Sequence, residues 1–330
     1  MFTKHRLLQG AAILTAAGLA SRLMGFFFRI FLSHAFGEES VGLYQLIFPV
    51  YALCLSASTA GIQTAVSRMT AEKVSLGQKE AAGNVLRIAL CLTLLLSLVE
   101  VLLIQQNAGH IAETFLGDPR CTEMLLIISY ALPCAAVHSC ICGYSFGMQR
   151  TELPAASQLI EQTARILFVV LLFIFMKDTG RTPSIKLAAA GIAAGEFASA
   201  VFSSKMLSAR KTFGQMPSLA AISQNTRELL TLSLPLTANR AAVTLLQSVE
   251  AASIPASLKL YGLDGSAAIS TYGVLTGMAL PCILFPSAIT NSVGTVLLPA
   301  VSAAQASGDR SSMVRLLKKA AASCLILGLS

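Results

Sequence analysis

The sequence predicts an all-α, polytopic integral membrane protein, and its composition supports that prediction first. Of the 330 residues, 55% are hydrophobic and only 12% are charged, and the mean hydropathy is +0.70. A water-soluble domain needs far more polar surface than this composition provides. Long apolar runs alternate with short charged clusters, as expected when hydrocarbon surrounds the runs and water surrounds the clusters. The run 88–104 also lacks the alternating polarity of a membrane β-strand, so we expect the spans to be helices.

Nine segments are candidate transmembrane helices, because they are mostly apolar and most of them reach the roughly twenty residues that one crossing requires. We interpret the first as a retained span, since its apolar stretch continues well beyond the length of a signal peptide. The eighth contains three prolines, so we expect it to be kinked or to emerge from the membrane. The ninth ends before a full crossing is complete. The nine segments are 7–32, 41–67, 84–104, 123–147, 156–176, 186–207, 229–257, 267–301 and 314–330.

Lysine and arginine are distributed unevenly between the two sets of loops. With the N-terminus inside, the inner segments hold 15 of these residues and the outer segments hold 5. This bias predicts a cytoplasmic N-terminus. The net charge of +8 is therefore mainly a topology signal, and we expect no nucleic-acid partner.

A long polar segment after the sixth span divides the chain. The short, glycine-bearing, acidic loops 36–40 and 261–266 resemble each other, which indicates a repeat offset of about 225 residues. Six spans per half would leave both halves in the same orientation, as in a parallel repeat. The predicted domains are an N-terminal lobe of six spans at 1–207, a cytoplasmic linker at 208–228, and a partial C-terminal lobe of about three spans at 229–330. We therefore expect a two-lobed bundle whose C-terminal lobe is truncated.

Span one contains two arginines, and ionisable groups at this depth usually face a wet cavity or a partner. Arg22 and Arg29 are seven residues apart, which places them two turns apart on one helix face. Together they can hold two anionic oxygens. The structural alternatives are that Arg29 extends to the outer interface and that Arg22 interacts with a helix C-terminus.

Span five carries a polar stripe on an otherwise apolar helix. Gln158, Glu161, Gln162 and Arg165 follow the spacing i, i+3, i+4, i+7 and so lie on one face that must avoid lipid. Glu161 and Arg165 have the favourable acid-first spacing for an ion pair. The stripe is predicted to line a transport cavity or to be an internal pair that packs helices together.

Span seven is also polar on two neighbouring faces. Arg240 and Gln247 share one face, and Asn239 and Glu250 lie on the next. We expect Asn239, Arg240 and Gln247 to line the cavity. A buried carboxyl group can exchange a proton, so Glu196 and Glu250 are candidate coupling residues, with an interhelical hydrogen bond as the alternative role of each.

Motifs for catalysis are missing from the sequence. It contains no Walker loop and no HExxH, and its four histidines show no ligand spacing. Cys140 and Cys142 diverge on a helix and have no metal-binding companion in the sequence pattern. We therefore expect no enzyme activity, no cofactor and no metal site. Any pumping would draw on an ion gradient, the membrane potential or removal of the substrate.

Particular strings along the first five spans carry a family resemblance. They are SRLMG at 21–25 with Arg29, GLYQ at 42–45, STAGI at 58–62, and GYSFGMQR at 143–150 followed by Pro154, Gln158, Glu161 and Arg165. These strings resemble the stage V sporulation protein B family. That family belongs to the polysaccharide-exporter branch of the superfamily that also contains multidrug extruders and lipid II flippases. The resemblance covers essentially the whole chain.

The resemblance implies a V-shaped pair of six-helix lobes around a central cavity that opens alternately to each side of a bacterial plasma membrane. Its implied cargo is an undecaprenyl-pyrophosphate-linked oligosaccharide or peptidoglycan precursor, carried to the outer leaflet for cell-wall, spore-cortex or polysaccharide synthesis. Family members usually have twelve to fourteen spans. Lipid II flippases also place arginines on spans one, two and eight. Arg22 and Arg29 match the first, but the stretches around 53–59 and Thr276 contain none.

Together these observations predict a flippase in which basic cavity residues hold a pyrophosphate and sugar head group while the lipid tail stays in the bilayer. The expected partners are the lipid-linked sugar, membrane lipids, a coupling ion (H⁺ or Na⁺) and cell-wall synthesis enzymes. Two alternatives remain open. One is a drug or metabolite antiporter of the same superfamily, for which acidic cavity residues are expected. The other is a non-transporting scaffold for cell-wall enzymes.

Overall fold

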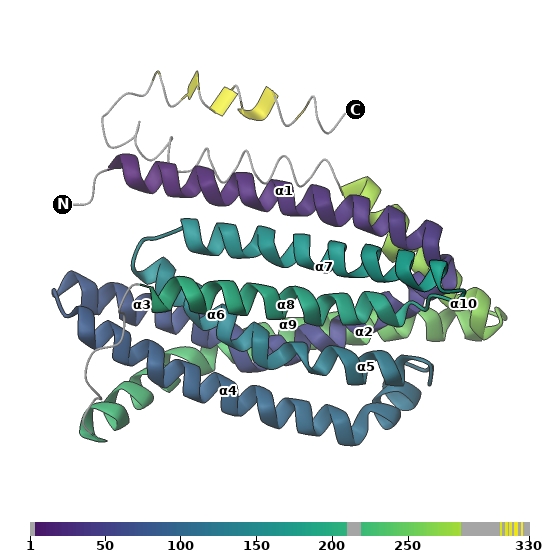
Figure 1. Ribbon diagram of the computed structural model, residues 1–330, viewed down its shortest axis with the longest axis horizontal. Helices are drawn as coiled ribbons and strands as arrows, with labels where there is room; N and C mark the ends of the chain where they lie inside the picture. Colours follow the sequence, from purple (N-terminus) through teal and green to yellow (C-terminus); the bar gives the residue numbers. More distant parts are fainter. Residues whose placement is uncertain are drawn as a thin grey trace.

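A computed structural model describes residues 4–209 and 219–284, together with nine positions between 311 and 325. Within these residues the chain is helical, contains three short π-helical segments and has no strand. The helices run roughly side by side along the long axis of the molecule (Figure 1). The elements are α1 (Lys4–Phe36), α2 (Glu38–Leu55), η1 (Ser56–Ala60), α3 (Gly61–Ser75), α4 (Lys79–His110), η2 (Ile111–Phe115), α5 (Cys121–Ser129), α6 (Ala131–Gly147), α7 (Glu152–Asp178), α8 (Lys186–Ser208), α9 (Leu219–Leu260), α10 (Gly265–Gly273) and η3 (Val274–Ala279).

The described helices confirm the predicted fold class. Seven of them are long and apolar enough to cross a membrane, and the number is eight if α5 and α6, which meet at a 41° bend, form one broken span. Each of the first eight predicted spans overlaps one of these helices or the α5–α6 pair. The ninth predicted span and most of the predicted linker lie largely outside the described residues.

Connections alternate between the two ends of the bundle. The turns after α3 and α6 lie at the end where α1 begins, whereas those after α1, η2, α7 and α9 lie at the opposite end, here named the α10 end (Figure 1). Gly37 has a φ of 79°, a left-handed conformation that lets α1 turn directly into α2. Successive spans therefore run in opposite directions, and the polar connections between them alternate between the two ends of the bundle. The inside or outside assignment of the two ends stays a prediction from the lysine and arginine bias.

Two buried clusters hold the first six spans together. One includes Leu46, Ile47, Leu125 and Ile192 from α2, α5 and α8, and the other joins α3, α4 and α6. Lipid is as apolar as these side chains, so close packing rather than removal from water stabilises such contacts. On α4, the large side chains of residues 95, 98 and 102 point outward at helical spacing, as expected for a lipid-facing surface.

Small and hydroxyl-bearing residues join α9 and α10 to the first spans. Ser248 Oγ donates to the Pro49 carbonyl at 3.0 Å, and Thr244 Oγ1 donates to Ser56 Oγ, also at 3.0 Å. Gly42 on α2 lies so close to the backbone of Ile269 on α10 that a Cβ atom there would overlap it. A small residue such as glycine in a membrane helix lets a neighbouring backbone approach this closely.

The described part of the eighth span contains a π-helical segment, whereas its predicted kinking or emergence from the membrane stays a prediction. Residues 274–279 form η3, and helix resumes through residue 284. Pro281 lacks the N–H that would bond to residue 277, so a wider helical turn just before it accommodates the missing bond. Pro286 and Pro299 lie outside the described residues.

Candidate functional site

A cavity of about 530 Å³ lies where α1, α7 and the η3 segment meet. Arg22 and Arg29 line it from α1, and Gln158 and Gln162 line it from α7. The structure therefore brings three of the predicted site residues, Arg22, Arg29 and Gln158, around one space. The complete lining is Ser21, Arg22, Gly25, Phe26, Arg29, Gln158, Gln162, Thr276, Leu280, Pro281 and Leu284.

This cavity is basic and amphipathic. Its described lining contains two arginines and no aspartate or glutamate. Amide groups of the two glutamines add donors and acceptors for uncharged polar ligands. Phe26, Leu280 and Leu284 supply an apolar wall. A ligand that combines an anionic group, hydroxyl groups and an apolar chain matches this combination of surfaces.

The cavity extends along the seam between α1 and η3. A second space of about 180 Å³ shares Phe26, Arg29 and Pro281 with it and reaches Ser33 and His34 near the end of α1. Ser33 Oγ contacts the Met278 sulfur at 3.5 Å across the seam. Arg29 thus borders both spaces, whereas Arg22 lies near the middle of the span.

The polar stripe of α7 divides into two parts. Gln158 and Gln162 line the cavity, but Glu161 and Arg165 are not among its lining residues. The second pair lies about 60° around the helix from the first, because three residues turn a helix by about 300°. There, Arg165 donates to Glu161 Oε1 at 2.5 Å, and the backbone and side-chain atoms of the pair pack on Gly195 of α8.

The Glu161–Arg165 pair belongs to a larger buried cluster. Glu196 on α8 has only 9% of its side chain exposed, accepts a hydrogen bond from Tyr51 Oη at 3.2 Å, and lies with its Oε2 atom 3.7 Å from His138 Nδ1. One ligand atom from each of His138, Glu161 and Glu196 falls within 4.8 Å of the others. These groups could together hold a cation. Sequence reasoning gave His138 no role, although a histidine inside an apolar span is a functional signal by itself.

The predicted residues of span seven lie elsewhere. Asn239, Arg240, Gln247 and Glu250 are exposed on α9, and none of them lines the cavity that contains Arg22. The opposite side of α9 contacts the first six spans through residues such as Thr244 and Ser248. Their cavity and coupling roles stay predictions.

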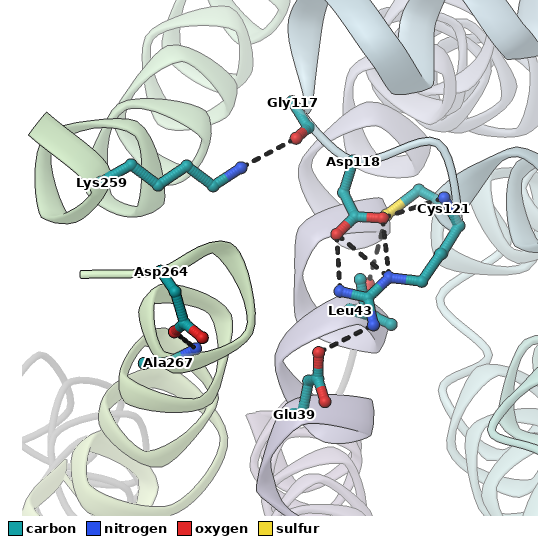
Figure 2. Close-up of polar contacts among 9 residues, drawn as sticks. Glu39, Leu43, Gly117, Asp118, Cys121, Lys259, Asp264 and Ala267 are labelled. Carbon is teal, nitrogen blue, oxygen red and sulfur yellow. Dashed lines mark hydrogen bonds and ion pairs between the residues drawn. The ribbon is translucent and has the colours of Figure 1, made fainter. Parts of the chain in front are cut away.

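A separate charged cluster lies at the α10 end, and Figure 2 shows its polar contacts. Arg120 donates to Asp118 Oδ2 and to Glu39 Oε1, both at 2.7 Å, and so ties the loop before α5 to the start of α2. Lys259 Nζ, at the end of α9, donates to the Gly117 carbonyl at 3.0 Å. Burial acts to raise the pKa of Asp118, but the hydrogen bonds and positive charge of Arg120 outweigh it and hold that pKa below its ordinary value.

Comparison with solved structures defines the class of fold. An inward-facing multidrug resistance MATE family transporter of the MOP superfamily matches with a TM-score of 0.60 and 15% identity, covering 100% of this chain and 69% of that chain. A MOP superfamily transporter from Pyrococcus furiosus matches with a TM-score of 0.60 and 18% identity, over 98% of this chain and 68% of that chain. The fold is therefore that of this transporter superfamily.

Sequence comparison then gives the family. The polysaccharide biosynthesis protein family model matches residues 7–305, and the chain belongs to that family. The chain is 35% identical to stage V sporulation protein B of Bacillus subtilis (strain 168) over 309 residues, which are 91% of this chain and 58% of that protein. It is 27% identical to lipid II flippase MurJ of the same organism over 173 residues, covering 50% of this chain and 32% of that protein. The resemblance to the sporulation protein B family is confirmed.

Proposed function

We propose that the protein is a flippase that carries an undecaprenyl-pyrophosphate-linked oligosaccharide or peptidoglycan precursor from the cytoplasmic to the outer leaflet. The observation that carries this proposal is the cavity at the α1–η3 seam, whose described lining contains two arginines and no carboxylate. Arginine binds phosphate groups through paired hydrogen bonds as well as through charge. The similarity to a lipid II flippase supports a lipid-linked cargo.

In the proposed complex, Arg22 and Arg29 hold the pyrophosphate. Gln158 and Gln162 are positioned to bind hydroxyl and amide groups of the sugar, because both line the same cavity from α7. The lipid tail leaves through the seam between α1 and η3 and stays in hydrocarbon. This arrangement spares the protein the cost of enclosing a long isoprenoid chain.

Alternating access in this proposal is a movement between an N-terminal lobe (1–207) and a C-terminal lobe (from 229). The described structure supports a conformation closed at the α10 end, since the approach of Gly42 to Ile269 and the Lys259–Gly117 hydrogen bond both join the lobes there. Opening must separate these contacts. Coupling to an ion through Glu196 or Glu250, and contact with cell-wall enzymes, belong to the same proposal.

Two other functions make different demands on the cavity. A drug antiporter that carries cations would favour acidic residues in the lining, and the described lining has none. A scaffold would bind no lipid-linked sugar. Binding of undecaprenyl pyrophosphate and of a cationic dye, measured side by side on the purified intact protein by native mass spectrometry, separates the three. We expect pyrophosphate-lipid binding without dye binding, and the reverse result would favour the antiporter.

The orientation is tested by labelling single cysteines in a cysteine-free background. With a cytoplasmic N-terminus, a cysteine at position 38 is labelled by an impermeant reagent from outside intact cells, and one at position 215 is protected. Protection at position 38 with labelling at position 215 would reverse the proposed direction of transport.

A further inference from the structure

The buried cluster formed by His138, Glu196 and their neighbours contains one negative charge without a matching cation. Glu161 and Glu196 contribute two carboxylates, and the only cation among their described contacts besides histidine is Arg165, which is bonded to Glu161. A buried carboxylate left without a counter-charge is costly in a membrane interior. The cluster is therefore one positive charge short when His138 is neutral.

The hydrogen-bond network around neutral His138 favours one of its two ring nitrogens as the carrier of the hydrogen. Ser157 Oγ donates its single hydrogen to the Pro154 carbonyl at 3.0 Å, and the same oxygen lies 2.9 Å from His138 Nε2. While Ser157 donates to the Pro154 carbonyl, its oxygen accepts from His138, and this arrangement places the imidazole hydrogen on Nε2. The lone pair of Nδ1 is then left on the side that faces Glu196.

Two acceptors consequently face each other across a short gap. His138 Nδ1 and Glu196 Oε2 are 3.7 Å apart, and Oε2 is buried without a hydrogen-bond partner among the described residues. The other carboxylate oxygen is already bonded by Tyr51 Oη at 3.2 Å. Two lone pairs repel unless a cation lies between them.

We propose that His138 and Glu196 form a proton-binding site inside the first six spans. A proton from water forms a bond to His138 Nδ1, and the resulting N–H donates to Glu196 Oε2. This supplies the missing positive charge and the missing donor at once. A proton suits the geometry better than a metal ion, since the one further carboxylate nearby, Glu161, already binds Arg165.

The surroundings of the site contain few other ionisable groups. Besides His138 and Glu196, the described titratable or charged neighbours are Tyr51 from α2, Cys134 and Cys142 from α6, and Glu161 and Arg165 from α7. When His138 is neutral, Arg165 and Glu161 are the only charged groups among these neighbours. Their opposite charges offset each other. The His138 side chain keeps 15% exposure.

The site is also connected to the contact between the lobes. Tyr51, which bonds to Glu196, lies two residues after Pro49, whose carbonyl accepts from Ser248 of α9. Binding of a proton changes the charge beside the Tyr51 hydroxyl. Helix α2 connects Tyr51 to the Pro49–Ser248 contact with α9 and to η1. Coupling of the bound proton to movement of the lobes rests on the proposed function, but binding of the proton does not.

The test is ¹⁵N NMR of the purified chain labelled at its four histidines. At alkaline pH, His138 is expected as the Nε2–H tautomer, and acidification is expected to convert it to the imidazolium form. Glu196→Gln should weaken proton binding at His138 at least tenfold, whereas Tyr51→Phe should retain it because both acceptors stay in place. His110→Gln, an exposed residue of α4, is the matched control and identifies a resonance unrelated to the site.

Each other outcome contradicts the proposal. The Nδ1–H tautomer, a His138 that stays neutral over the whole range in which the protein is folded, or unchanged titration in Glu196→Gln would overturn it. A shift of the His138 Nδ1 resonance at constant pH on exchanging choline for Na⁺, or on adding Zn²⁺, would make this a metal site instead. If the wild-type protein fails to bind pyrophosphate lipid yet shows the titration, the proposed function fails while the proton site stands.

Discussion

The arginines of this protein occur in two contrasting environments. Arg120 and Arg165 are held by carboxylates, Arg120 by Asp118 and Glu39 and Arg165 by Glu161. Arg22 and Arg29 instead line a cavity whose described wall contains no carboxylate. A cation bonded to an internal carboxylate stabilises helix packing, whereas one that borders an acid-free cavity adds positive potential to the space a ligand would fill. Substitutions in the two environments should therefore affect different measurements.

The largest effect on stability is expected at the buried pair on α7. Arg165→Ala leaves Glu161 buried without its partner, and removal of one member of such a pair costs about 3 to 5 kcal/mol in the free energy of unfolding. Replacement of both residues by leucine strands no charge and should cost less. Denaturant unfolding in detergent micelles measures both. Equal losses in the single and double variants would show that the ion pair does not explain the stability of this site.

A smaller loss is expected at the α10 end. Arg120→Ala leaves Asp118, which is only 6% exposed, without its donor, and we expect a cost of about 1 to 2 kcal/mol because Arg120 itself is partly solvated. Lys259→Ala removes a single hydrogen bond and is the milder comparison. Labelling of a cysteine in the α10 end should also become faster in Arg120→Ala if this cluster keeps that end closed. Unchanged stability and unchanged labelling would show that the cluster neither stabilises the fold nor keeps the α10 end closed.

The same cluster predicts a dependence of stability on pH. The pKa of Asp118 is lower in the folded protein than in the unfolded chain, so the folded state binds fewer protons at this residue. Its contribution is fully present above the ordinary aspartate pKa of about 4 and is lost as the pH falls through the lowered value. Thermal unfolding between pH 6 and pH 3, compared with Asp118→Asn, measures it. A variant with the same acid sensitivity as wild type would contradict this origin.

The smallest effect on stability is expected in the cavity. Arg29→Ala leaves no carboxylate stranded in the described lining, so we expect a change of about 0.5 kcal/mol or less, as at most exposed positions. The same unfolding experiment measures it, with Arg181→Ala in the exposed α7–α8 loop as the control. A loss in the free energy of unfolding comparable to that of Arg165→Ala would show that the cavity side of α1 also depends on arginine for helix packing.

Hydropathy alone predicted the eight described spans well, because the need to bury some twenty apolar residues acts locally along the chain. Helical spacing likewise predicted that Arg22 and Arg29 share a face. It could not predict that the α7 stripe divides between the cavity and α8, since that depends on which neighbours flank the helix. His138 and the Arg120 cluster were missed for a similar reason, because Arg120 and Glu39 are 81 positions apart in sequence and meet only in the folded chain.

The most direct test of the central claim is flipping of a lipid-linked sugar by Arg22 variants of the intact protein, read from exposure of the head group on the outer leaflet. Arg22→Ala should abolish or sharply reduce flipping while expression and membrane insertion stay normal. Arg22→Lys should restore only part of it, because lysine keeps the charge but loses the paired hydrogen bonds of the guanidinium group. Full rescue by lysine would reduce the role of Arg22 to charge alone. Wild-type flipping by Arg22→Ala would contradict the proposal that the cavity binds an anionic head group.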